Sequence, residues 1–500
     1  MVESNSGSNT RHLPIVIIGT GFGGIALAVK LQEAGIEDFS IFERAKEVGG
    51  TWRDNTYPGC ACDVASNLYS YSFAPNPDWT RTHSTQPEIF EYLKKVTSDY
   101  DLYPNIRFNH ELEKAEWDSE NQRWRISTNQ GDFTCDVLTT AAGPFGNPVI
   151  PKFPGVDAFK GESFHTFNWD HGCDIAGKNV AIIGTGATSV QVVPAIQPIV
   201  KQLTVFQRTP SHILPRLDIA TSAIKRAASK HIPLFQRSIR SMWYGVYESL
   251  VGLPQFVDSR FLVPFEKVTR YHLNNQVKDK TLREKLSPNY RFGCKRPVFS
   301  SLYYPALQES NVDLVCESIK EIRENSIVDA DGNEHAVDVL IYATGFRIPH
   351  QISEKLIGEG GRSLSQFFGT KPKSFMGTSF SGFPNLFMML GPFSAAGNQS
   401  AVFMLETQAD YITKAILAMR KQNLATVDVR EDVLTAFSND VEQRSQKTSW
   451  VSGGCNSYFQ NPEGGNGGLW PNWSFMHRWQ SRQFEVAKYN VTRRTELENV

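Results

Sequence analysis

Two stretches of the chain share one arrangement: residues 13–24 read LPIVIIGTGFGG, and residues 179–189 read NVAIIGTGATS. Each begins with an apolar run typical of a buried strand, bends through a glycine-rich turn and continues into a helix-like pattern. In such a turn the first glycine allows the bend, the second lets the backbone approach a pyrophosphate, and the third packs helix against strand. The corresponding residues are Gly19, Gly21 and Gly24 in the first stretch, and Gly184, Gly186 and Ser189 in the second. The repeat predicts two dinucleotide-binding units, the alternative being glycine turns without a ligand.

Each glycine turn has a matching apolar strand further along the chain, ending at Gly143 for the first unit and at Gly345 for the second. We therefore expect an α/β fold with two doubly wound, Rossmann-like dinucleotide-binding domains and a helical insertion in the second. The expected FAD-binding domain is split between residues 1–145 and 347–500. The expected NADPH-binding domain comprises residues 150–215 and 292–346, with the helical insertion at 216–291.

The residues expected beside the adenosine ribose differ between the two units. In the first, Glu43 ends the second strand, where a carboxylate accepts hydrogen bonds from a free ribose diol. In the second, Gln207 and Arg208 stand at the matching place, and a guanidinium binds a phosphate with two parallel hydrogen bonds. This contrast predicts FAD in the first unit and NADPH in the second. A solvated arginine at a strand end is the alternative for Arg208.

The composition excludes several classes of protein. The 51 Lys and Arg residues nearly balance the 52 Asp and Glu residues, so no global positive field would attract a nucleic acid. No apolar stretch approaches the ~18 residues that an integral membrane segment needs. The polar start, residues 1–12, lacks the apolar core of a secretory signal, and seven scattered cysteines do not suggest a disulfide framework. We expect a cytoplasmic protein without a metal site.

The inserted and C-terminal segments have helical patterns of their own. Amphipathic helices are predicted over residues 221–231, 235–250 and 266–286, and a longer helix over 400–422 with Ser400 as its cap. A loop rich in Gly and Trp follows, from Trp450 to Trp479. Because it carries few cations, we interpret it as a mobile lid over an apolar pocket.

The segment before the second glycine turn carries the most specific pattern. Residues 157–170 read DAFKGESFHTFNWD, in which His165 alone would be interpreted as a linker histidine and Trp169 as a core aromatic. Together with its neighbours, however, the segment resembles the fingerprint of Baeyer–Villiger monooxygenases. The matching residues are Phe159, Gly161, His165, Thr166, Trp169 and Asp170.

The resemblance extends over nearly the whole chain. Residues 49–64 are similar to the family's flavin-contact segment, and residues 293–304 to the segment that holds a paired lysine and arginine. It implies that Arg296 is the catalytic arginine, that Asp63 orients it, and that Lys295 assists the 2′-phosphate. The further cofactor-binding residues that it implies are Gly50, Thr51, Trp52, Tyr69, Gln191 and Thr209.

The resemblance implies an enzyme that uses FAD, NADPH and O₂. Through a C4a-peroxyflavin, such an enzyme inserts one oxygen next to a ketone carbonyl and releases an ester or lactone. Arginine suits the catalytic position because it stays protonated and offers several hydrogen-bond donors to the developing negative charge. Substitution of His165 or Trp169 is expected to slow the cycle without changing the ratio of regioisomeric esters.

Three other functions share the two-nucleotide architecture. A disulfide reductase needs a redox cysteine pair, but Cys60 and Cys62 are separated by only one residue. A flavin monooxygenase that hydroxylates nitrogen or sulfur would differ at the Trp169–Asp170 end of the fingerprint. A non-catalytic, redox-responsive flavoprotein would have no reason to keep Arg296.

Overall fold

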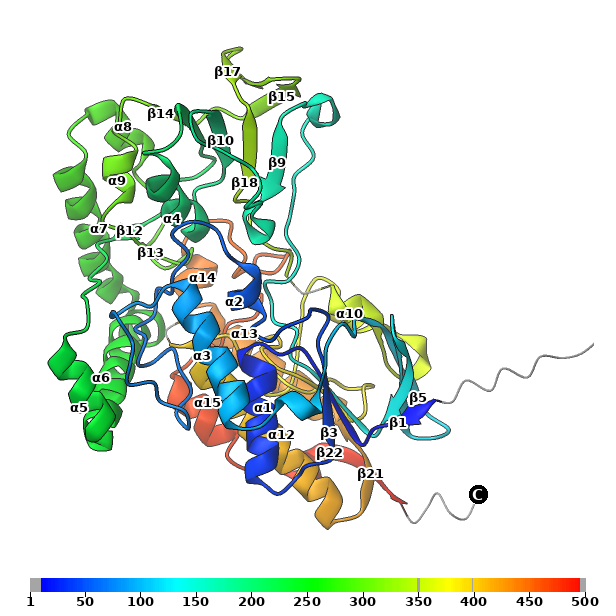
Figure 1. Ribbon diagram of the computed structural model, residues 1–500. Helices are drawn as coiled ribbons and strands as arrows, with labels where there is room; N and C mark the ends of the chain where they lie inside the picture. The colour runs from blue at the N-terminus through cyan, green and yellow to red at the C-terminus, as the bar shows by residue number, and fades with distance from the viewer. Residues whose placement is uncertain (1–9, 349–350, 398, 495–500) are drawn as a thin grey trace, which may run out of the picture.

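The computed structural model describes residues 10–348, 351–397 and 399–494, so most of the predicted polar tail lies outside the described residues. Two parallel sheets lie in different parts of the molecule, with a group of helices to one side (Figure 1). Each sheet contains a strand that leads directly into a glycine turn, as the repeat predicted. The fold is α/β with two Rossmann-like domains and a helical insertion in the second.

The first sheet has the strand order β20-β8-β2-β3-β4, and all its pairs are parallel. The four residues of β2, IVII, are all buried, as expected for a strand covered on both faces. Helix α1 follows the turn and packs along α12, which arrives from the C-terminal part of the chain. The bounds are β2 Ile15–Ile18, β3 Phe39–Phe42, β4 Ile106–Arg107, β8 Val137–Thr140, β20 Leu386–Met388, α1 Phe22–Glu33 and α12 Ala401–Lys421.

The second sheet has the order β14-β11-β10-β18-β9, again with parallel pairs throughout. Strand β10 leads into the second glycine turn and helix α4. Strand β9 contains the middle of the fingerprint segment, with His165 as its last residue, and forms the sheet edge beside β18. The bounds are β9 Glu162–His165, β10 Asn179–Ile183, β11 Gln202–Phe206, β14 Val312–Val315, β18 Val339–Tyr342, α4 Ala187–Ile196 and α9 Tyr303–Ala306.

Four further sheets, one of them five-stranded, and several helices complete the fold. The strands are β1 Arg11–His12, β5 Leu112–Asp118, β6 Arg123–Thr128, β7 Gly131–Cys135 and β19 Leu356–Ile357 in one sheet, β15 Ile319–Arg323, β16 Ser326–Asp329 and β17 Glu334–Ala336 in another, and the pairs β12 Ile213–Leu214 with β13 Val298–Phe299 and β21 Leu424–Val429 with β22 Tyr489–Arg493. The helices are α2 Thr51–Asp54, α3 Gln86–Asp99, α10 Ile352–Lys355, α11 Leu364–Phe368 and α13 Glu431–Ser445.

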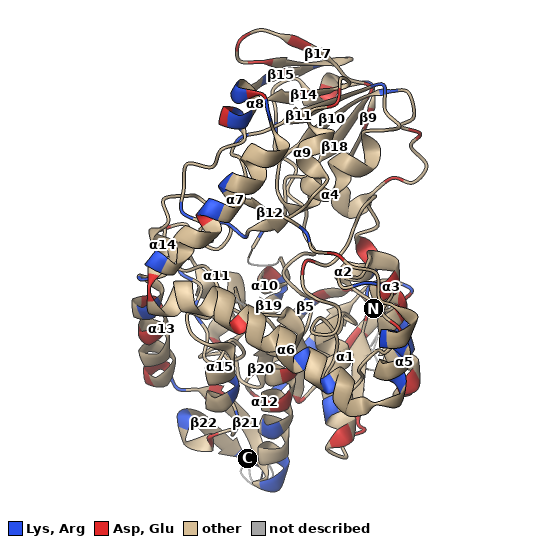
Figure 2. Cartoon of the chain, turned by 90° about the vertical axis from the view of Figure 1, so that its left-hand side faces the viewer, with Lys and Arg blue, Asp and Glu red and all other residues tan. Residues whose placement is uncertain are grey.

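The helical insertion forms one side of the molecule, where α6 and α7 face the viewer in Figure 2. Its helices are α5 Ala223–His231, α6 Pro233–Gly252, α7 Val263–Gln276 and α8 Lys280–Lys285. The prediction of a single helix over residues 266–286 was wrong. The chain breaks after Gln276, and the side chain of Asp279 accepts a hydrogen bond from the Leu282 amide to cap α8.

The C-terminal part confirms one prediction and corrects another. Ser400 caps α12, its hydroxyl accepting a hydrogen bond from the Val402 amide. The stretch from Trp450 to Trp479 is not a loop throughout, because helices α14 (Ser449–Ser452) and α15 (Ser474–Gln480) occupy its two ends. Burial of Trp450 and His477 favours these helical turns, since each places an aromatic side chain in the interior.

Within the described residues, no helix has both the length and the apolar character needed to cross a membrane. A buried ion pair holds the insertion to α12. Arg240 of α6 lies 3.3 Å from the Glu406 carboxylate of α12 and donates to the backbone carbonyls of residues 67, 68 and 70. The amide and hydroxyl of Ser72 donate to the same carboxylate. These bonds join three distant segments.

Replacement of Arg240 by methionine should therefore destabilise the protein. Glu406, only 3% exposed, would keep a buried charge without its main partner, which costs about 3 kcal/mol. We expect a lower melting temperature in scanning calorimetry. Arg430→Met, which removes an exposed pair with Asp432, is the matched control and should leave the melting temperature unchanged. Equal melting temperatures for both variants would contradict a structural role for Arg240.

Candidate functional site

The first glycine turn is shaped by close backbone contacts. Gly19 has a φ of +104°, and a Cβ on Gly24 would overlap the carbonyl oxygen of Gly19. Gly21 is different, because the nearest atom to a Cβ there would be the Cα of Gly50, 3.9 Å away. No side chain caps the N-terminus of α1. The turn therefore leaves amide groups and space on one side, as a bound pyrophosphate requires.

Glu43 lies at the predicted place but already has several partners. Its carboxylate accepts hydrogen bonds from the amide and hydroxyl of Thr20 and from the Ala45 amide, and Arg53 lies 2.9 Å away. Burial acts to raise the pKa of Glu43, but Arg53 and Thr20 outweigh it and leave the pKa lowered. The carboxylate is thus held in its ionised form, the form that accepts hydrogen bonds from a ribose diol.

The segment at 49–64 lies directly on the first turn. Gly50 begins α2, which contains Thr51 and Trp52, and a Cβ on Gly50 would come within 3.1 Å of the Gly21 Cα. The Trp52 indole donates to the Tyr69 hydroxyl over 3.0 Å. The structure thus brings these four predicted cofactor-binding residues next to the glycine turn.

The second glycine turn has the same construction. Gly184 has a φ of +112°, while a Cβ on Gly186 would meet no atom within 4 Å. No side chain caps the N-terminus of α4. Ser189 is fully buried, and its hydroxyl has no hydrogen-bond partner among the described residues. Contacts within the protein therefore do not explain why residue 186 is a glycine. A close approach of a ligand to the backbone would explain it.

Two cations meet beside the second turn. Burial lowers the pKa of Lys295, and the nearby positive charge of Arg208 lowers it further. Lys295 also lies 5.3 Å from the centre of the Tyr290 ring. Gln207 is not free to bind a ligand, because its amide donates to the Lys285 carbonyl. Two like charges held together favour an anion between them, as a 2′-phosphate would provide.

Gln191, predicted as a cofactor-binding residue, makes contacts within the protein. Its side-chain carbonyl accepts from the Tyr57 hydroxyl, and its side-chain amide donates to the Ala61 carbonyl. A Cβ on Gly59 would lie 2.5 Å from the Gln191 carbonyl oxygen. Gln191 therefore joins the flavin-contact segment to α4 of the second domain. Thr209, also predicted as a cofactor residue, accepts a hydrogen bond from the Thr185 hydroxyl at its carbonyl.

Asp63 and Arg296 meet between the two turns. A guanidinium nitrogen of Arg296 lies 4.0 Å from the Asp63 carboxylate, which is 8% exposed, whereas the arginine side chain is 48% exposed. Burial raises the pKa of Asp63, and the guanidinium groups of Arg296 and Arg216 oppose this rise. One carboxylate oxygen of Asp63 has no hydrogen-bond partner among the described residues. The Arg296 guanidinium is thus the exposed member of the pair, and the Asp63 carboxylate is the buried member.

Two residues of this group were not predicted from the sequence. Arg216 donates to the Cys62 carbonyl beside Asp63. Tyr458 lies in the C-terminal loop, residues 453–473 between α14 and α15, and interacts with Arg296. Burial acts to lower the pKa of Arg296, but Tyr458 and Asp63 outweigh it and leave the pKa raised. Neither residue belongs to a recognisable motif, so only their position in the folded chain reveals them.

The fingerprint residues lie at the connection between the domains. Gly161 is required there because a Cβ would overlap the Asp338 carbonyl oxygen, and the Phe159 ring lies against the same position. His165 is buried, and burial lowers its pKa to about 4. Thr166 is buried next to it, Trp169 packs edge-on against Phe164, and Asp170 is exposed. His165 is therefore uncharged at neutral pH.

Two of the buried cysteines are free thiols, whereas another pair forms a disulfide. Cys60 and Cys62 are free and buried, and burial raises the pKa of each thiol to about 12. Such thiols form almost no thiolate, so they cannot act as the redox pair of a disulfide reductase. A disulfide that the sequence did not suggest joins Cys294, next to Lys295, to Cys455 in the C-terminal loop.

Known proteins are similar to this chain in sequence. A family model described as pyridine nucleotide-disulphide oxidoreductase matches residues 16–216. A Baeyer–Villiger monooxygenase of Streptomyces coelicolor is 41% identical over 486 residues, covering 97% of this chain and 93% of the relative. The chain belongs to the Baeyer–Villiger monooxygenase family. A second member, from Pseudomonas aeruginosa, is 39% identical and covers 96% of this chain and 92% of its own length.

Solved structures of related monooxygenases have the same overall fold. A steroid monooxygenase bound to NADP superposes with a TM-score of 0.85 at 28% identity, over 96% of this chain and 99% of that chain. A cyclohexanone monooxygenase from Rhodococcus bound to NADP⁺ superposes with a TM-score of 0.85 at 26% identity, over 97% and 100%. Two full-length relatives named as Baeyer–Villiger monooxygenases favour this reading over an N- or S-hydroxylating enzyme or a non-catalytic flavoprotein.

The residues present fit the two cofactors of this family. At both turns the second glycine faces space that a Cβ would partly fill, and both following helices lack a side-chain cap. The first turn has an ionised carboxylate for a ribose diol, and the second has two cations for a 2′-phosphate. The donor sets thus match FAD in the first domain and NADPH in the second.

Arg208→Ala tests the assignment of the second site. Loss of a charge-assisted hydrogen bond to the phosphate should raise the KM for NADPH by roughly 10- to 100-fold and leave the KM for NADH nearly unchanged. Steady-state kinetics with both nicotinamides measures this. Lys201→Ala, at an exposed lysine, is the control. An equal rise for both nicotinamides would show that Arg208 does not bind the phosphate.

Alkylation tests the state of the two buried thiols. In the native protein at pH 8, Cys60 and Cys62 should resist iodoacetamide, because a pKa of about 12 leaves only roughly one thiol in ten thousand ionised. Cys316, which is partly exposed, is the internal reference and should be labelled. Peptide mass spectrometry before and after unfolding in urea reports each site. Rapid labelling of Cys60 or Cys62 in the folded protein would contradict the proposed inertness.

Proposed function

We propose that the protein is an FAD-containing, NADPH-dependent monooxygenase that uses O₂ to convert a ketone into an ester or lactone. The observation that supports this most directly is the position of Arg296. Its half-exposed guanidinium lies 4.0 Å from the buried Asp63 carboxylate, between one nucleotide site suited to FAD and one suited to NADPH. A fixed cation at that place is what an oxygen-transfer reaction with anionic steps requires.

The division of the chain follows from the two sites. Residues 1–145 and 347–500 would hold FAD, whereas residues 150–215 and 292–346 would hold NADPH, with residues 216–291 as the insertion. When bound, the nicotinamide supplies a hydride and the flavin supplies activated oxygen. The fingerprint residues, with an uncharged His165, would connect the two halves and not touch the ketone.

Arg296 would bind the negative charge that develops on oxygen during the reaction. Its guanidinium remains protonated and presents several donors in one plane, so it can stabilise an oxyanion derived from the ketone carbonyl. Asp63 would orient this guanidinium from behind, and its own charge is balanced by Arg296 and Arg216. Lys295, the next residue in the chain, would bind the 2′-phosphate together with Arg208.

Arg296→Ala is the deciding experiment. We expect the variant to bind FAD and to be reduced by NADPH under anaerobic conditions, because hydride transfer needs no cation for an oxyanion. Ester formation should fall by roughly 10²- to 10³-fold, and the oxygen consumed should appear as hydrogen peroxide. Stopped-flow reduction and product analysis by gas chromatography measure the two steps.

Two further variants complete this test. Arg296→Lys should restore ester formation only in part, because an ammonium lacks the planar pair of donors. Arg260→Ala, at an arginine whose side chain is 89% exposed, is the control and should behave as the wild type. Ester formation by Arg296→Ala at a yield near that of the wild type would overturn the assignment.

A further inference from the structure

The disulfide between Cys294 and Cys455 joins two segments that are 161 residues apart in the sequence. The first segment is residues 293–296, named here the catalytic turn, and the second is the C-terminal loop. Cys294 stands directly before Lys295 and Arg296 in the chain. Tyr458, in the same loop as Cys455, interacts with the Arg296 guanidinium. The covalent bond is therefore two residues from the proposed catalytic cation, and the loop that it holds lies against that cation.

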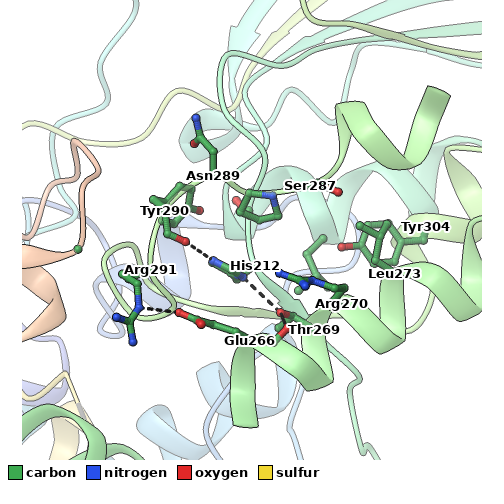
Figure 3. A pocket seen from close by; sticks show the side chains of 14 residues that line it. His212, Glu266, Thr269, Arg270, Leu273, Ser287, Asn289, Tyr290, Arg291 and Tyr304 are labelled. Carbon is green, nitrogen blue, oxygen red and sulfur yellow. Dashed lines mark hydrogen bonds and ion pairs between the residues drawn. The ribbon is translucent and has the colours of Figure 1, made fainter. Parts of the chain in front are cut away.

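The turn has anchors on its other flank. Arg291 lies 2.8 Å from the Glu266 carboxylate of α7, and the buried His212 donates to the Tyr290 carbonyl over 2.9 Å (Figure 3). After the turn, the Val298 amide donates to the His212 carbonyl. The Arg291–Glu266 pair attaches the chain before the catalytic turn to α7 of the insertion. The two bonds of His212 attach the chain before and after that turn to the segment that follows β11.

Between these anchors, the contacts of Cys294 go to the C-terminal loop. The Ser457 hydroxyl donates to the Cys294 carbonyl over 3.1 Å, and the Arg291 amide donates to the Gly453 carbonyl. A Cβ on Gly453 would come within 2.9 Å of the Cys294 sulfur, so the two segments are in direct contact. The disulfide thus joins the chain just before Arg296 to the loop that carries Tyr458.

The two sulfurs differ in their access to solvent. Cys294 is fully buried, whereas Cys455 is only half buried. A pocket of about 410 Å³ opens beside the same turn, between α7 and residues 287–291, and reaches Gly453 (Figure 3). Cys455 is therefore the cysteine of the pair that a small reagent can reach more readily.

We propose that Cys294 and Cys455 form a peroxide-sensitive thiol–disulfide pair that positions Arg296. This proposal rests on the proposed function, because hydrogen peroxide is released when activated oxygen is not transferred to a ketone. The Cys455 thiolate attacks one peroxide oxygen, the O–O bond breaks, and a sulfenic acid and water form. The Cys294 thiol then displaces water and forms the disulfide, so that two thiols and one peroxide yield one disulfide and two waters.

The consequence is a feedback on the reaction itself. With the thiols reduced, the loop can leave Arg296, and more oxygen is lost as peroxide. That peroxide closes the disulfide, which returns Tyr458 to the guanidinium and restores transfer to the ketone. A small dithiol would supply two electrons and two protons to reopen the pair.

The first measurement does not depend on turnover. The FAD-loaded enzyme is treated with hydrogen peroxide or with a dithiol, and non-reducing peptide mapping follows the Cys294–Cys455 link. Chymotrypsin then probes the loop at Tyr458 and Phe459, and we expect cleavage at least roughly tenfold slower in the oxidised form, because the link suppresses local opening. Cys455→Ser should be cleaved rapidly in both states. Absence of the link after peroxide treatment, or equal cleavage in both states, would overturn the proposal.

The second measurement is the ratio of ester to hydrogen peroxide formed per NADPH consumed. Reduction of the wild type should lower this ratio by roughly tenfold, because a small displacement of the guanidinium weakens its contact with the reacting oxygen. Peroxide treatment should restore it. Cys455→Ser should keep the low ratio in both states, and Cys173→Ser, at a free cysteine, should respond like the wild type.

The outcomes separate this proposal from the proposed function. If the oxidised wild type forms ester and the ratio does not change on reduction, the cysteine pair does not position Arg296, although the enzyme activity stands. If no tested ketone gives ester, the proposed function fails, and the cleavage of the loop still decides whether the disulfide controls it.

Discussion

A fixed positive charge beside a buried carboxylate is the constraint on which the rest of this site depends. Asp63 comes from the first domain and Arg296 from the second, and the Arg296 guanidinium opposes the rise in the pKa of Asp63 that burial causes. A carboxylate that is 8% exposed needs nearby cations, since burial alone would favour its protonated form. The two nucleotide-binding domains must therefore meet at this point, and the Gln191 amide and the Arg240–Glu406 pair hold them there.

The two glycine turns show how one backbone design is adapted to two ligands. Both turns bend a strand into an uncapped helix, which is a local property of the chain. Their electrostatics differ because Glu43 is balanced by Arg53, whereas Arg208 and Lys295 face each other without a carboxylate in contact among the described residues. Shared geometry thus selects a dinucleotide, and the neighbouring charges distinguish the phosphorylated one from the other.

The cysteines show that burial decides chemistry as much as residue type does. Cys60 and Cys62 lie within the segment at residues 49–64, yet their raised pKa values make them inert. Cys294 and Cys455 belong to segments that carry no cysteine motif, and folding alone brings them into a covalent bond. The spacing that identifies redox pairs in sequences is local and cannot detect a pair formed between distant segments.

Features that depend on near neighbours in the chain could be predicted from the sequence alone. These are the two strand–turn–helix units, the Ser400 cap and the contrast between Glu43 and Arg208, because turn chemistry and strand periodicity act over a few residues. The family resemblance pointed to Asp63 and Arg296. Only the tertiary structure decided that Tyr458 and the Cys294–Cys455 bond lie against this pair and that Gln191 joins the domains. Such contacts join residues more than a hundred positions apart, and they exist only once the packed cores have brought those segments together.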